Sequence, residues 1–354
     1  MLEAAMISPD SSDSPDSPDF PGDARRGIPA IDRLLGDPAL RALISLYGRD
    51  PVRITARRVV DGLRERWTAA SPPENEREST VAGLPGRIAA EVEAALGGPL
   101  RRVLNATGLF LHTNLGRAPL PREVAASLPP LLDAYCDLEF DLETGRRSQR
   151  LRRVERLLTA LTGAEAAAVV NNNAAALVLI LSTLAQGREV VVSRGELVEI
   201  GDSFRIPEIM AAAGARLAEV GATNRTRPAD YRNAAGPETA LLLKVFPSNF
   251  RLTGFVASVS PAELVAVGRE VCVPVLVDEG SGLLRRHPAP QLAGHPSMTE
   301  LVAAGCDLVC GSGDKLPGGP QAGLIVGREA LVTRCRRHPL YRALRPDRLA
   351  LAAL

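Results

Sequence analysis

Lysine is rare in this chain, and its rarity draws attention to the two lysines that remain. Lysine and arginine together number 42, but only Lys244 and Lys315 are lysines. Arginine stays protonated, whereas a lysine amine can lose its proton and form a Schiff base with an aldehyde. A lysine kept among so many arginines is therefore a candidate for chemistry that arginine cannot perform.

Lys315 lies in a glycine-rich stretch, residues 311–323, directly after the apolar run 306–310. This pattern predicts a buried strand that opens into a loop, where α/β enzymes place their reactive groups. A phosphate-binding P-loop would need Gly-Lys-Ser/Thr, which is not the sequence around Lys315. An ordinary surface lysine is the alternative on local sequence alone. We predict that Lys315 is the Schiff-base lysine for pyridoxal phosphate (PLP).

Two further residues could serve the same cofactor. Asp278 follows the apolar residues 274–277 and precedes glycine and serine, so we expect it at the carboxyl end of a strand. A carboxylate there can keep the pyridine nitrogen of PLP protonated, which makes the ring an electron sink. The alternative role for Asp278 is a helix N-cap. Ser312, three residues before Lys315, can offer its hydroxyl to the cofactor phosphate.

Three consecutive asparagines, Asn171, Asn172 and Asn173, separate a short apolar run from an alanine-rich helical pattern. Free N–H groups at the start of a helix, together with amide side chains, can hold a phosphate. Simple N-capping is the alternative, but it would need only one asparagine. We therefore predict that these asparagines bind the cofactor phosphate.

Residues 101–120 mix apolar residues with Asn, Thr, His and Gly, which is poor strand chemistry. We expect a loop that approaches the site. Within it Arg117 stands between a glycine and an alanine, and it is a candidate to bind an anion. A salt bridge on a turn is the alternative.

Strand and helix patterns alternate through the second half of the chain. We expect strands at residues 166–170, 190–192, 217–220, 241–245, 274–277, 308–310 and 323–326. Such alternation predicts an α/β fold with a mostly parallel sheet covered by helices on both faces. The order of asparagines, strand-end aspartate and Ser-Gly-Asp-Lys is that of a fold-type-I PLP-dependent enzyme. We assign this large domain to residues 99–335.

The N-terminal part of the chain has a different character. Residues 1–27 repeat Ser-Pro-Asp and carry few large apolar side chains, so we expect a disordered tail. Apolar residues at helical spacing predict a small helical domain at residues 28–98, with one of its helices beginning at Thr80. One helix face is rich in arginine: Arg57, Arg58, Arg64 and Arg66. A solvated helix surface is the commoner reading of such a face than an RNA site.

The overall composition excludes several classes of protein. The formal net charge is +1, so no global field attracts nucleic acid, and an RNA contact would need a local patch. The five cysteines show no paired metal-ligand spacing, and Cys306 and Cys310 have no histidine nearby, which favours buried thiols in a reducing cytoplasm and no metal site. No apolar run is long enough to span a membrane, and we expect no membrane or DNA partner.

From about residue 28 to its last residue, the chain resembles the bacterial L-seryl-tRNA(Sec) selenium transferases, also called selenocysteine synthases. The resemblance rests on Leu-Asn-Ala-Thr-Gly, His-Thr-Asn-Leu-Gly-Arg-Ala-Pro-Leu, Asn-Asn-Asn, Ser-Arg-Gly-Glu-Leu-Val-Glu-Ile-Gly, Gly-Ala-Thr-Asn-Arg-Thr and Ser-Gly-Asp-Lys, at residues 104–108, 112–120, 171–173, 193–201, 221–226 and 312–315.

The resemblance implies PLP on Lys315, and it implies that L-seryl-tRNA(Sec) becomes L-selenocysteinyl-tRNA(Sec) through an aminoacrylyl-tRNA, with selenophosphate as the selenium donor. It implies that the N-terminal helical domain contacts the tRNA and that the chains form a ring of dimers with sites at subunit interfaces. The positions that match the family's selenophosphate site are Arg117, Arg342 and Arg345.

The chain also departs from the pattern of that family. Glu279 stands where an apolar residue is expected, and Phe246-Pro247 replaces a more polar pair. Family chains extend well beyond Leu354, so residues 336–354 are expected to begin a truncated C-terminal domain. Two alternatives stay open: a related PLP-dependent lyase for a small phosphorylated substrate, and a non-catalytic RNA-binding homologue.

Overall fold

The structure is a computed structural model that describes residues 24–70, 72–97, 100–197, 199–200, 204–247 and 250–354. The chain forms two compact units that divide between Val103 and Leu104. Most of the predicted tail, residues 1–23, lies outside the described residues. The end of that prediction is wrong, because Ala24–Gly27 forms a short 3-10 helix, η1.

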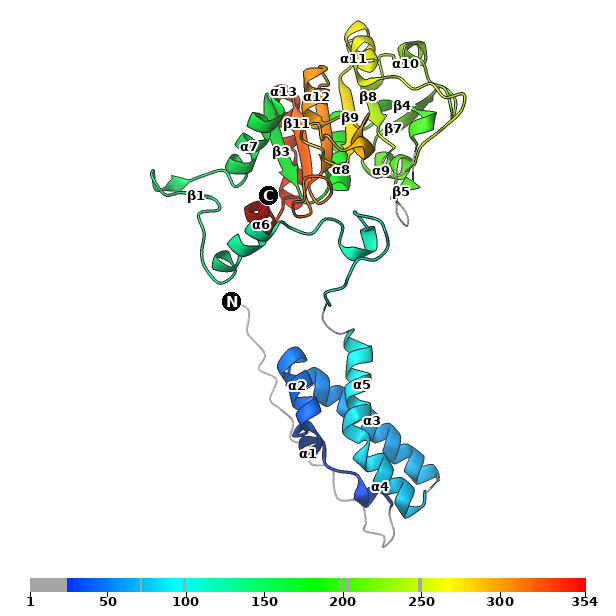
Figure 1. Cartoon of the computed structure of the whole chain (residues 1–354), viewed down its shortest axis with the longest axis vertical. Helices are drawn as coiled ribbons and strands as arrows, with labels where there is room; N and C mark the ends of the chain where they lie inside the picture. Colours follow the sequence, from blue (N-terminus) through cyan, green and yellow to red (C-terminus); the bar gives the residue numbers. More distant parts are fainter. Residues whose placement is uncertain (1–23, 71, 98–99, 198, 201–203, 248–249) are drawn as a thin grey trace, which may run out of the picture. The chain divides into compact units, whose positions relative to one another are not determined.

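The described part of the first unit is helical (Figure 1). Its helices are α1 (Ile31–Leu35), α2 (Pro38–Tyr47), α3 (Arg49–Ala69), α4 (Glu74–Ala82) and α5 (Leu84–Leu96). Asp37 caps α2 by accepting a bond from the Ala39 N–H at 2.9 Å, and Gly97 ends α5 with a left-handed φ of 75°. The helix predicted to begin at Thr80 is wrong in its boundary, because Gly83 separates α4 from α5.

The helices of this unit pack through one apolar cluster. The fully buried members include Leu40, Val52, Val60, Ile88 and Val92, each 0% exposed. These residues recur at helical spacing in α2, α3 and α5, so one stripe of each helix meets the others. The opposite face of α3 is left to solvent.

The second unit is built around a seven-stranded sheet in the order β3-β11-β10-β9-β8-β4-β7 (Figure 1). The strands are β3 (Ala166–Val170), β4 (Glu189–Ser193), β7 (Arg216–Val220), β8 (Thr239–Val245), β9 (Val275–Gly280), β10 (Leu308–Ser312) and β11 (Gly323–Gly327). β11 runs antiparallel to both neighbours, and the other pairs are parallel. All of the predicted strands are present, and the mostly parallel sheet is confirmed.

Helices cover both faces of this sheet. One face packs on α8 (Asn173–Leu184), α9 (Ile206–Ala212) and α13 (Glu329–Arg337). The other packs on α7 (Arg152–Thr162), α10 (Pro228–Ala234), α11 (Pro261–Glu270) and α12 (Met298–Ala303). Each strand therefore needs apolar side chains on both sides, and β8 is buried along its whole length.

Smaller elements surround the sheet. They are α6 (Arg122–Ser127), α14 (Pro339–Ala343), α15 (Arg348–Ala353), the pair β1 (Phe140–Asp141) and β2 (Arg146–Arg147), the pair β5 (Glu199–Ile200) and β6 (Phe204–Arg205), and the 3-10 helices η2 (Thr113–Leu115), η3 (Pro129–Leu131), η4 (Arg194–Glu196) and η5 (Pro290–Leu292). No helix among the described residues is long and apolar enough to cross a membrane.

The predicted domain boundary after Cys335 is not observed. It falls inside α13, which continues to Arg337, and residues up to Leu354 belong to the same compact unit as the sheet. Leu351 of α15 is 9% exposed and joins the core cluster on the α7 face. Residues 336–354 are therefore part of the sheet-containing unit.

Gly323→Ala is expected to destabilise this unit strongly. A Cβ at Gly323 would lie 2.1 Å from the carbonyl oxygen of Asn172, so the start of β11 would have to move away from α8. We expect the free energy of unfolding to fall by about 3 kcal/mol, measured by urea denaturation. Gly236→Ala is the control, since nothing lies within 4 Å of its Cβ position. Equal stability of the two variants would contradict this account of the packing.

Candidate functional site

The predicted reactive residues meet at the carboxyl edge of the sheet. β9 and β10 are parallel neighbours, so Asp278 near the end of β9 and Ser312 at the end of β10 lie at the same edge. Lys315 follows Ser312 by three residues. One detail differs from the prediction, because β9 continues through Asp278 to Gly280 rather than ending before it.

Asp278 is buried, with 4% of its surface exposed. The side-chain N–H of Asn173 donates to its Oδ1 at 2.9 Å, and the thiol of Cys310 donates to the same oxygen at 3.8 Å. Burial raises the pKa of Asp278 to about 6, although the Asn173 bond favours the charged form. Among the described residues no hydrogen bond to Oδ2 is found, so that oxygen can receive a proton-bearing nitrogen.

The three asparagines do not act as one group. Asn172 is the N-cap of α8, since its Oδ1 accepts the Ala175 N–H at 2.8 Å. Asn173 reaches Asp278 instead of facing a phosphate, and its buried Oδ1 has no hydrogen-bond partner in the described part of the chain. Asn171 is exposed and lines a separate hollow. N-capping, the simpler alternative for this motif, thus explains one of the three.

Lys315 is half-buried, and its amine has no hydrogen bond or ion pair among the residues that the structure describes. Burial and the charge of Arg117 lower the pKa of Lys315, while Asp278 and other nearby carboxylates oppose the change. A lowered pKa leaves more of the amine neutral at physiological pH, and the neutral amine is the nucleophilic form. These features suit a Schiff-base lysine.

Arg117 forms the salt bridge that was the alternative to anion binding. Its Nη1 lies 2.6 Å from Oδ2 of Asp314, and the Ala118 N–H donates to the Asp314 carbonyl oxygen at 3.2 Å. Arg117 itself has a left-handed φ of 61°, which is uncommon outside glycine. These contacts tie the predicted loop at residues 101–120 to the loop that carries Lys315.

The other two candidate arginines are placed differently from each other. Arg345 lines a hollow of about 520 Å³, which shares Leu120, Pro320 and Gln321 with the hollow of about 420 Å³ beside Arg117. Arg345 pairs with Glu139 at 3.5 Å. Arg342 is exposed and is not among the described residues that line either hollow. Arg117 and Arg345 thus line hollows with three residues in common, whereas Arg342 lines neither.

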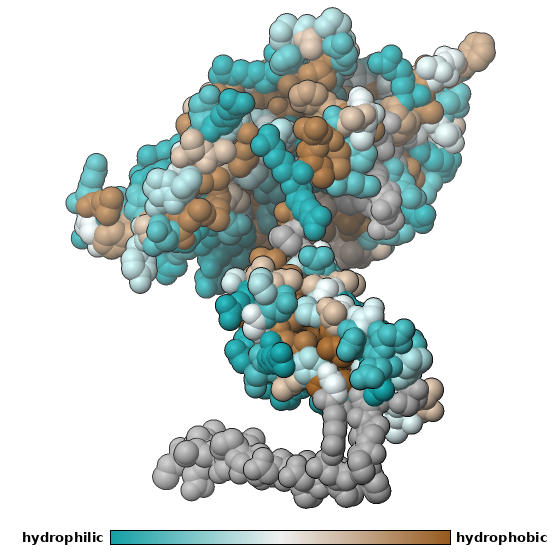
Figure 2. Space-filling view, turned by 60° about the horizontal axis from the view of Figure 1, so that its bottom comes forward, coloured by the Kyte–Doolittle hydropathy of each residue, from teal (hydrophilic) through white to brown (hydrophobic). Residues whose placement is uncertain are grey.

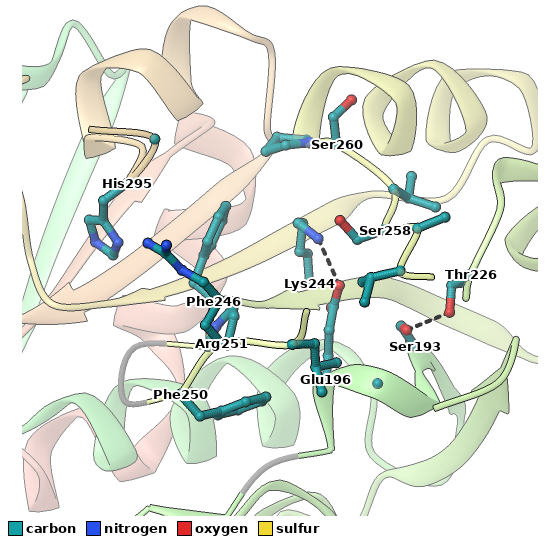
Figure 3. A pocket seen from close by; sticks show the side chains of 18 of the residues that line it. Ser193, Glu196, Thr226, Lys244, Phe246, Phe250, Arg251, Ser258, Ser260 and His295 are labelled. Carbon is teal, nitrogen blue, oxygen red and sulfur yellow. Dashed lines mark hydrogen bonds and ion pairs between the residues drawn. The ribbon is translucent and has the colours of Figure 1, made fainter. Parts of the chain in front are cut away.

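A larger cavity of about 710 Å³ is lined by Lys244, Glu196 and Phe246, and the sequence did not predict it (Figure 3). At its inner wall the amine of Lys244 lies 2.7 Å from Glu196, whose second oxygen accepts the Val245 N–H at 2.9 Å. Burial raises the pKa of Glu196, and the charge of Lys244 opposes that change. The available signal was the rarity of lysine, which drew attention to Lys244 but did not identify its partner.

Glu279, which departs from the family pattern, has its own partners. Its side chain is fully buried and bonds to Nε2 of His295 and to the Gly282 N–H. The His295 ring packs edge-on against Phe246, with ring centroids 6.1 Å apart. Glu279 thus shares none of the hydrogen-bond partners of Asp278 among the described residues.

The residues present fit PLP. Among the described residues, Asp278 offers a carboxylate oxygen without a hydrogen bond in a buried site, and Asn173 has an orphaned amide oxygen beside it. Lys315 has an amine without a partner there, and its pKa responds to the charge of Asp278. Ser312 is buried at the end of β10, close to the turn that carries Lys315. This set of side chains matches a pyridine nitrogen, an aldehyde and a phosphate better than it matches a metal ion.

Asp278→Asn is expected to stabilise the cofactor-free protein at neutral pH. Burial raises the pKa of Asp278 to about 6, so between about pH 4 and 6 the folded state binds a proton that the unfolded chain has lost. Protonation of Asp278 therefore favours the folded state at low pH. This contribution to the free energy of unfolding is lost as the pH rises through 6. At pH 7.5 the uncharged amide should add up to about 3 kcal/mol.

The measurement is thermal or urea unfolding of both proteins from pH 4 to pH 7.5. The stabilisation should shrink below pH 6 and be largely gone at pH 4. Asp133→Asn, at an exposed position, is the control and should show no such trend. A gain that is equal at pH 4 and pH 7.5 would show that charge burial at Asp278 is not its cause.

Comparison with known proteins agrees with this site. The family described as L-seryl-tRNA selenium transferase matches residues 103–354, and that described as selenocysteine synthase N terminal matches residues 25–64. The L-seryl-tRNA(Sec) selenium transferase of Geobacter metallireducens is 52% identical over 92% of this chain and 70% of its own length. That of Moorella thermoacetica is 50% identical over 93% of this chain and 69% of its own.

Among solved structures, D-glucosaminate-6-phosphate ammonia-lyase aligns with a TM-score of 0.58 and 22% identity, covering 74% of this chain and 68% of that one. This likeness concerns the fold alone, and it agrees with the predicted fold-type-I architecture. The family match spans both units, with residues 103–354 covering the sheet and every candidate site residue. The chain belongs to the L-seryl-tRNA(Sec) selenium transferase family.

Proposed function

We propose that this protein converts L-seryl-tRNA(Sec) into L-selenocysteinyl-tRNA(Sec), with PLP as cofactor and selenophosphate as the selenium donor. The observation that carries the proposal is the unpaired amine of Lys315 beside the buried carboxylate of Asp278, in a chain of this family. The relatives that the chain matches bear the name of this activity. In the overall reaction the hydroxyl at Cβ of serine is replaced by selenium, and phosphate leaves.

The roles of the residues follow from their positions. Lys315 would hold the cofactor through its aldehyde, Asp278 would keep a proton on the pyridine nitrogen, and Ser312 would face the phosphate. When bound, PLP supplies a sink for the electron pair left when the serine Cα loses its proton. The Lys315 amine, with its lowered pKa, is the base that takes this proton.

The atoms balance in two stages. Removal of the Cα proton and of the Cβ hydroxyl releases one water and leaves a double bond. Selenium then adds at Cβ, the phosphorus–selenium bond is cleaved, and water completes the phosphate that leaves. The second stage needs a site for a small anion next to Lys315, for which we propose Arg117, Arg345 and Arg342.

The structure supports Arg117 and Arg345 as ligands of the anion more directly than it supports Arg342. Arg117 and Arg345 line hollows that share three residues, and each is paired with a carboxylate: Asp314 for Arg117 and Glu139 for Arg345. An arriving phosphate can replace a carboxylate partner, because a guanidinium binds both through the same paired N–H groups. Arg342, on α14, would have to reach the anion from an exposed position.

We assign tRNA binding to the N-terminal helical unit. On α3 the side chains of Arg57, Arg58, Arg64 and Arg66 are exposed, whereas Val60, Leu63 and Trp67 are buried. The near-neutral charge of the whole chain means that attraction to phosphates must come from such a local face. The match to the selenocysteine synthase N-terminal family covers most of this helix.

We also propose that the protein is a homo-oligomer, with a ring of dimers as the expected form, and that it acts in the cytoplasm. Large apolar side chains between residues 100 and 142 lie exposed, among them Leu104 at 92%, Phe110 at 88% and Leu142 at 75%. Figure 2 shows hydrophobic residues, coloured brown, on the face that it presents. Large apolar side chains are exposed where a partner covers them, and we propose that role for this segment. The five cysteines are free thiols, which suits a reducing compartment.

A lyase for a small phosphorylated substrate is the less supported alternative. Its support is the fold shared with D-glucosaminate-6-phosphate ammonia-lyase, at 22% identity. The N-terminal helical unit and its family match favour a tRNA-bound substrate instead.

The test of the proposed function is incubation with seryl-tRNA(Sec) and selenophosphate, followed by analysis of the aminoacyl group. The wild-type protein should yield selenocysteine, and Lys315→Ala should yield none and lose the visible absorbance of lysine-bound PLP. Lys244→Gln is the control for this absorbance, because glutamine can still donate to Glu196 and the band should remain. Loss of the band in Lys244→Gln with its retention in Lys315→Ala would refute the assignment.

Removing arginines from α3 should weaken tRNA binding in a salt-dependent way. We expect a triple variant, Arg57→Gln with Arg58→Gln and Arg66→Gln, to bind tRNA(Sec) less tightly while keeping its PLP absorbance. Each lost phosphate contact should reduce the slope of log affinity against log salt by about 1. Filter binding across a salt series measures both quantities.

A charge-matched control replaces three exposed arginines of the sheet-containing unit: Arg216, Arg232 and Arg286. It removes the same net charge, so it separates the α3 face from the field of the whole protein. If both triple variants showed the wild-type affinity and slope, the helical unit would not be the tRNA-binding element.

A further inference from the structure

The cavity of about 710 Å³ has no role in the scheme above. It lies at the carboxyl ends of β4, β8 and β9, and its lining includes Ser281 and Leu316, the residue after Lys315. The Leu316 N–H donates to the Ser281 carbonyl oxygen at 3.0 Å, so this part of the wall is fixed to the lysine loop. Whatever fills the cavity therefore lies against the loop that carries Lys315.

If the proposed function holds, the covalent structure of the substrate indicates which group must lie in the space next to Lys315. The seryl group is an ester of the terminal ribose of the tRNA, and only the carbonyl carbon separates the serine Cα from that ester oxygen. When the serine amine lies at Lys315, the terminal adenosine must occupy space directly beside the lysine. The cavity that Leu316 lines is space next to this loop, with a volume in the range of small-molecule sites.

The inner wall offers hydrogen-bond donors without an excess of charge. An ammonium group has three N–H donors, and Lys244 gives one to Glu196 at 2.7 Å. Both oxygens of Glu196 are already occupied, by Lys244 and by the Val245 N–H. Because the two charges balance, this wall favours neutral hydroxyl or ring-nitrogen acceptors over a phosphate.

An aromatic side wall is held in a fixed orientation. The Phe246 ring is half-buried between two groups: His295, edge-on at 6.1 Å, and the Lys244 amine, 5.4 Å from the ring centroid (Figure 3). His295 is in turn bonded to buried Glu279. Because the ring is already held in place, the stacking of a base on it costs little free energy for ordering the side chain.

We propose that this cavity binds the terminal adenosine of the aminoacylated tRNA, with the base against Phe246 and a ribose oxygen toward Lys244. The exposed Arg251 at the mouth is then placed to meet the phosphate that links the preceding nucleotide. The site would hold the ester beside Lys315 independently of the contacts that the helical unit makes with the body of the tRNA.

The probe is 3′-serylamino-3′-deoxyadenosine, an amide that resists hydrolysis, together with its uridine counterpart. Its dissociation constant is read from the change in the PLP absorbance of the holoenzyme. We expect the adenosine compound to bind about tenfold more weakly to Phe246→Leu than to the wild type, a loss within the range for one stacked base. Phe246→Tyr keeps the ring and should bind within about twofold of the wild type.

Phe255→Leu is the matched control, because Phe255 is 82% exposed and does not line the cavity. It should bind the adenosine compound as the wild type does. An unchanged dissociation constant in Phe246→Leu would overturn the inference. If that variant lost its cofactor, equal binding of the adenosine and uridine compounds to the wild type would overturn it instead.

These results are separable from the proposed function. A wild-type protein that makes no selenocysteinyl-tRNA(Sec) would refute the function itself. A wild-type protein that makes it, and whose binding of the adenosine compound is insensitive to Phe246→Leu, would refute only the nucleoside site.

Discussion

The burial of the Asp278 carboxylate is the constraint on which the site depends. A charge taken out of water is costly unless it is paired, and the two groups that bond to Asp278, Asn173 and Cys310, are neutral donors to one oxygen. The raised pKa of Asp278, about 6, reflects this incomplete compensation. A protonated pyridine nitrogen would complete it, so the fold carries an unfavourable feature that cofactor binding can relieve.

A second buried carboxylate follows Asp278 directly in β9 and has separate partners. Asp278 is bonded to Asn173 and Cys310, whereas Glu279 is bonded to His295 and to the Gly282 N–H. The pairing of β9 with β10 shifts register at Glu279, since Cys310 is opposite Asp278 and Gly311 is opposite Gly280. At this irregularity the two adjacent carboxylates each acquire their own hydrogen bonds. His295, the partner of Glu279, in turn lines the cavity that Leu316 also lines.

The fold and the reactive pair were predictable because they depend on local pattern. Apolar runs of strand length end in glycine or polar residues, and this places Asp278 and Lys315 at one sheet edge without knowledge of tertiary contacts. The partners of buried polar groups were not predictable. Glu196 and Lys244 are 48 residues apart and Asn173 and Asp278 are 105 apart, so neither pairing leaves a periodic signal. The helix start predicted at Thr80 and the domain boundary predicted after Cys335 were wrong for a related reason. Where a helix breaks, and whether a terminal segment packs on the sheet, depend on tertiary contacts.

The salt bridge between Arg117 and Asp314 links the chemistry at Lys315 to the binding of an anion. Asp314 precedes the lysine directly, and its carboxylate is the partner that an incoming phosphate must replace at Arg117. If a phosphate displaced Asp314 from Arg117, the Asp314 carboxylate, whose side chain is only 11% exposed, would lose its ion-pair partner beside the Lys315 amine. A negative charge there favours the protonated amine, whereas the nearby guanidinium favours the neutral one. Anion binding and the protonation state of the lysine are therefore coupled through one ion pair, and an arginine at position 117 does more than attract the donor.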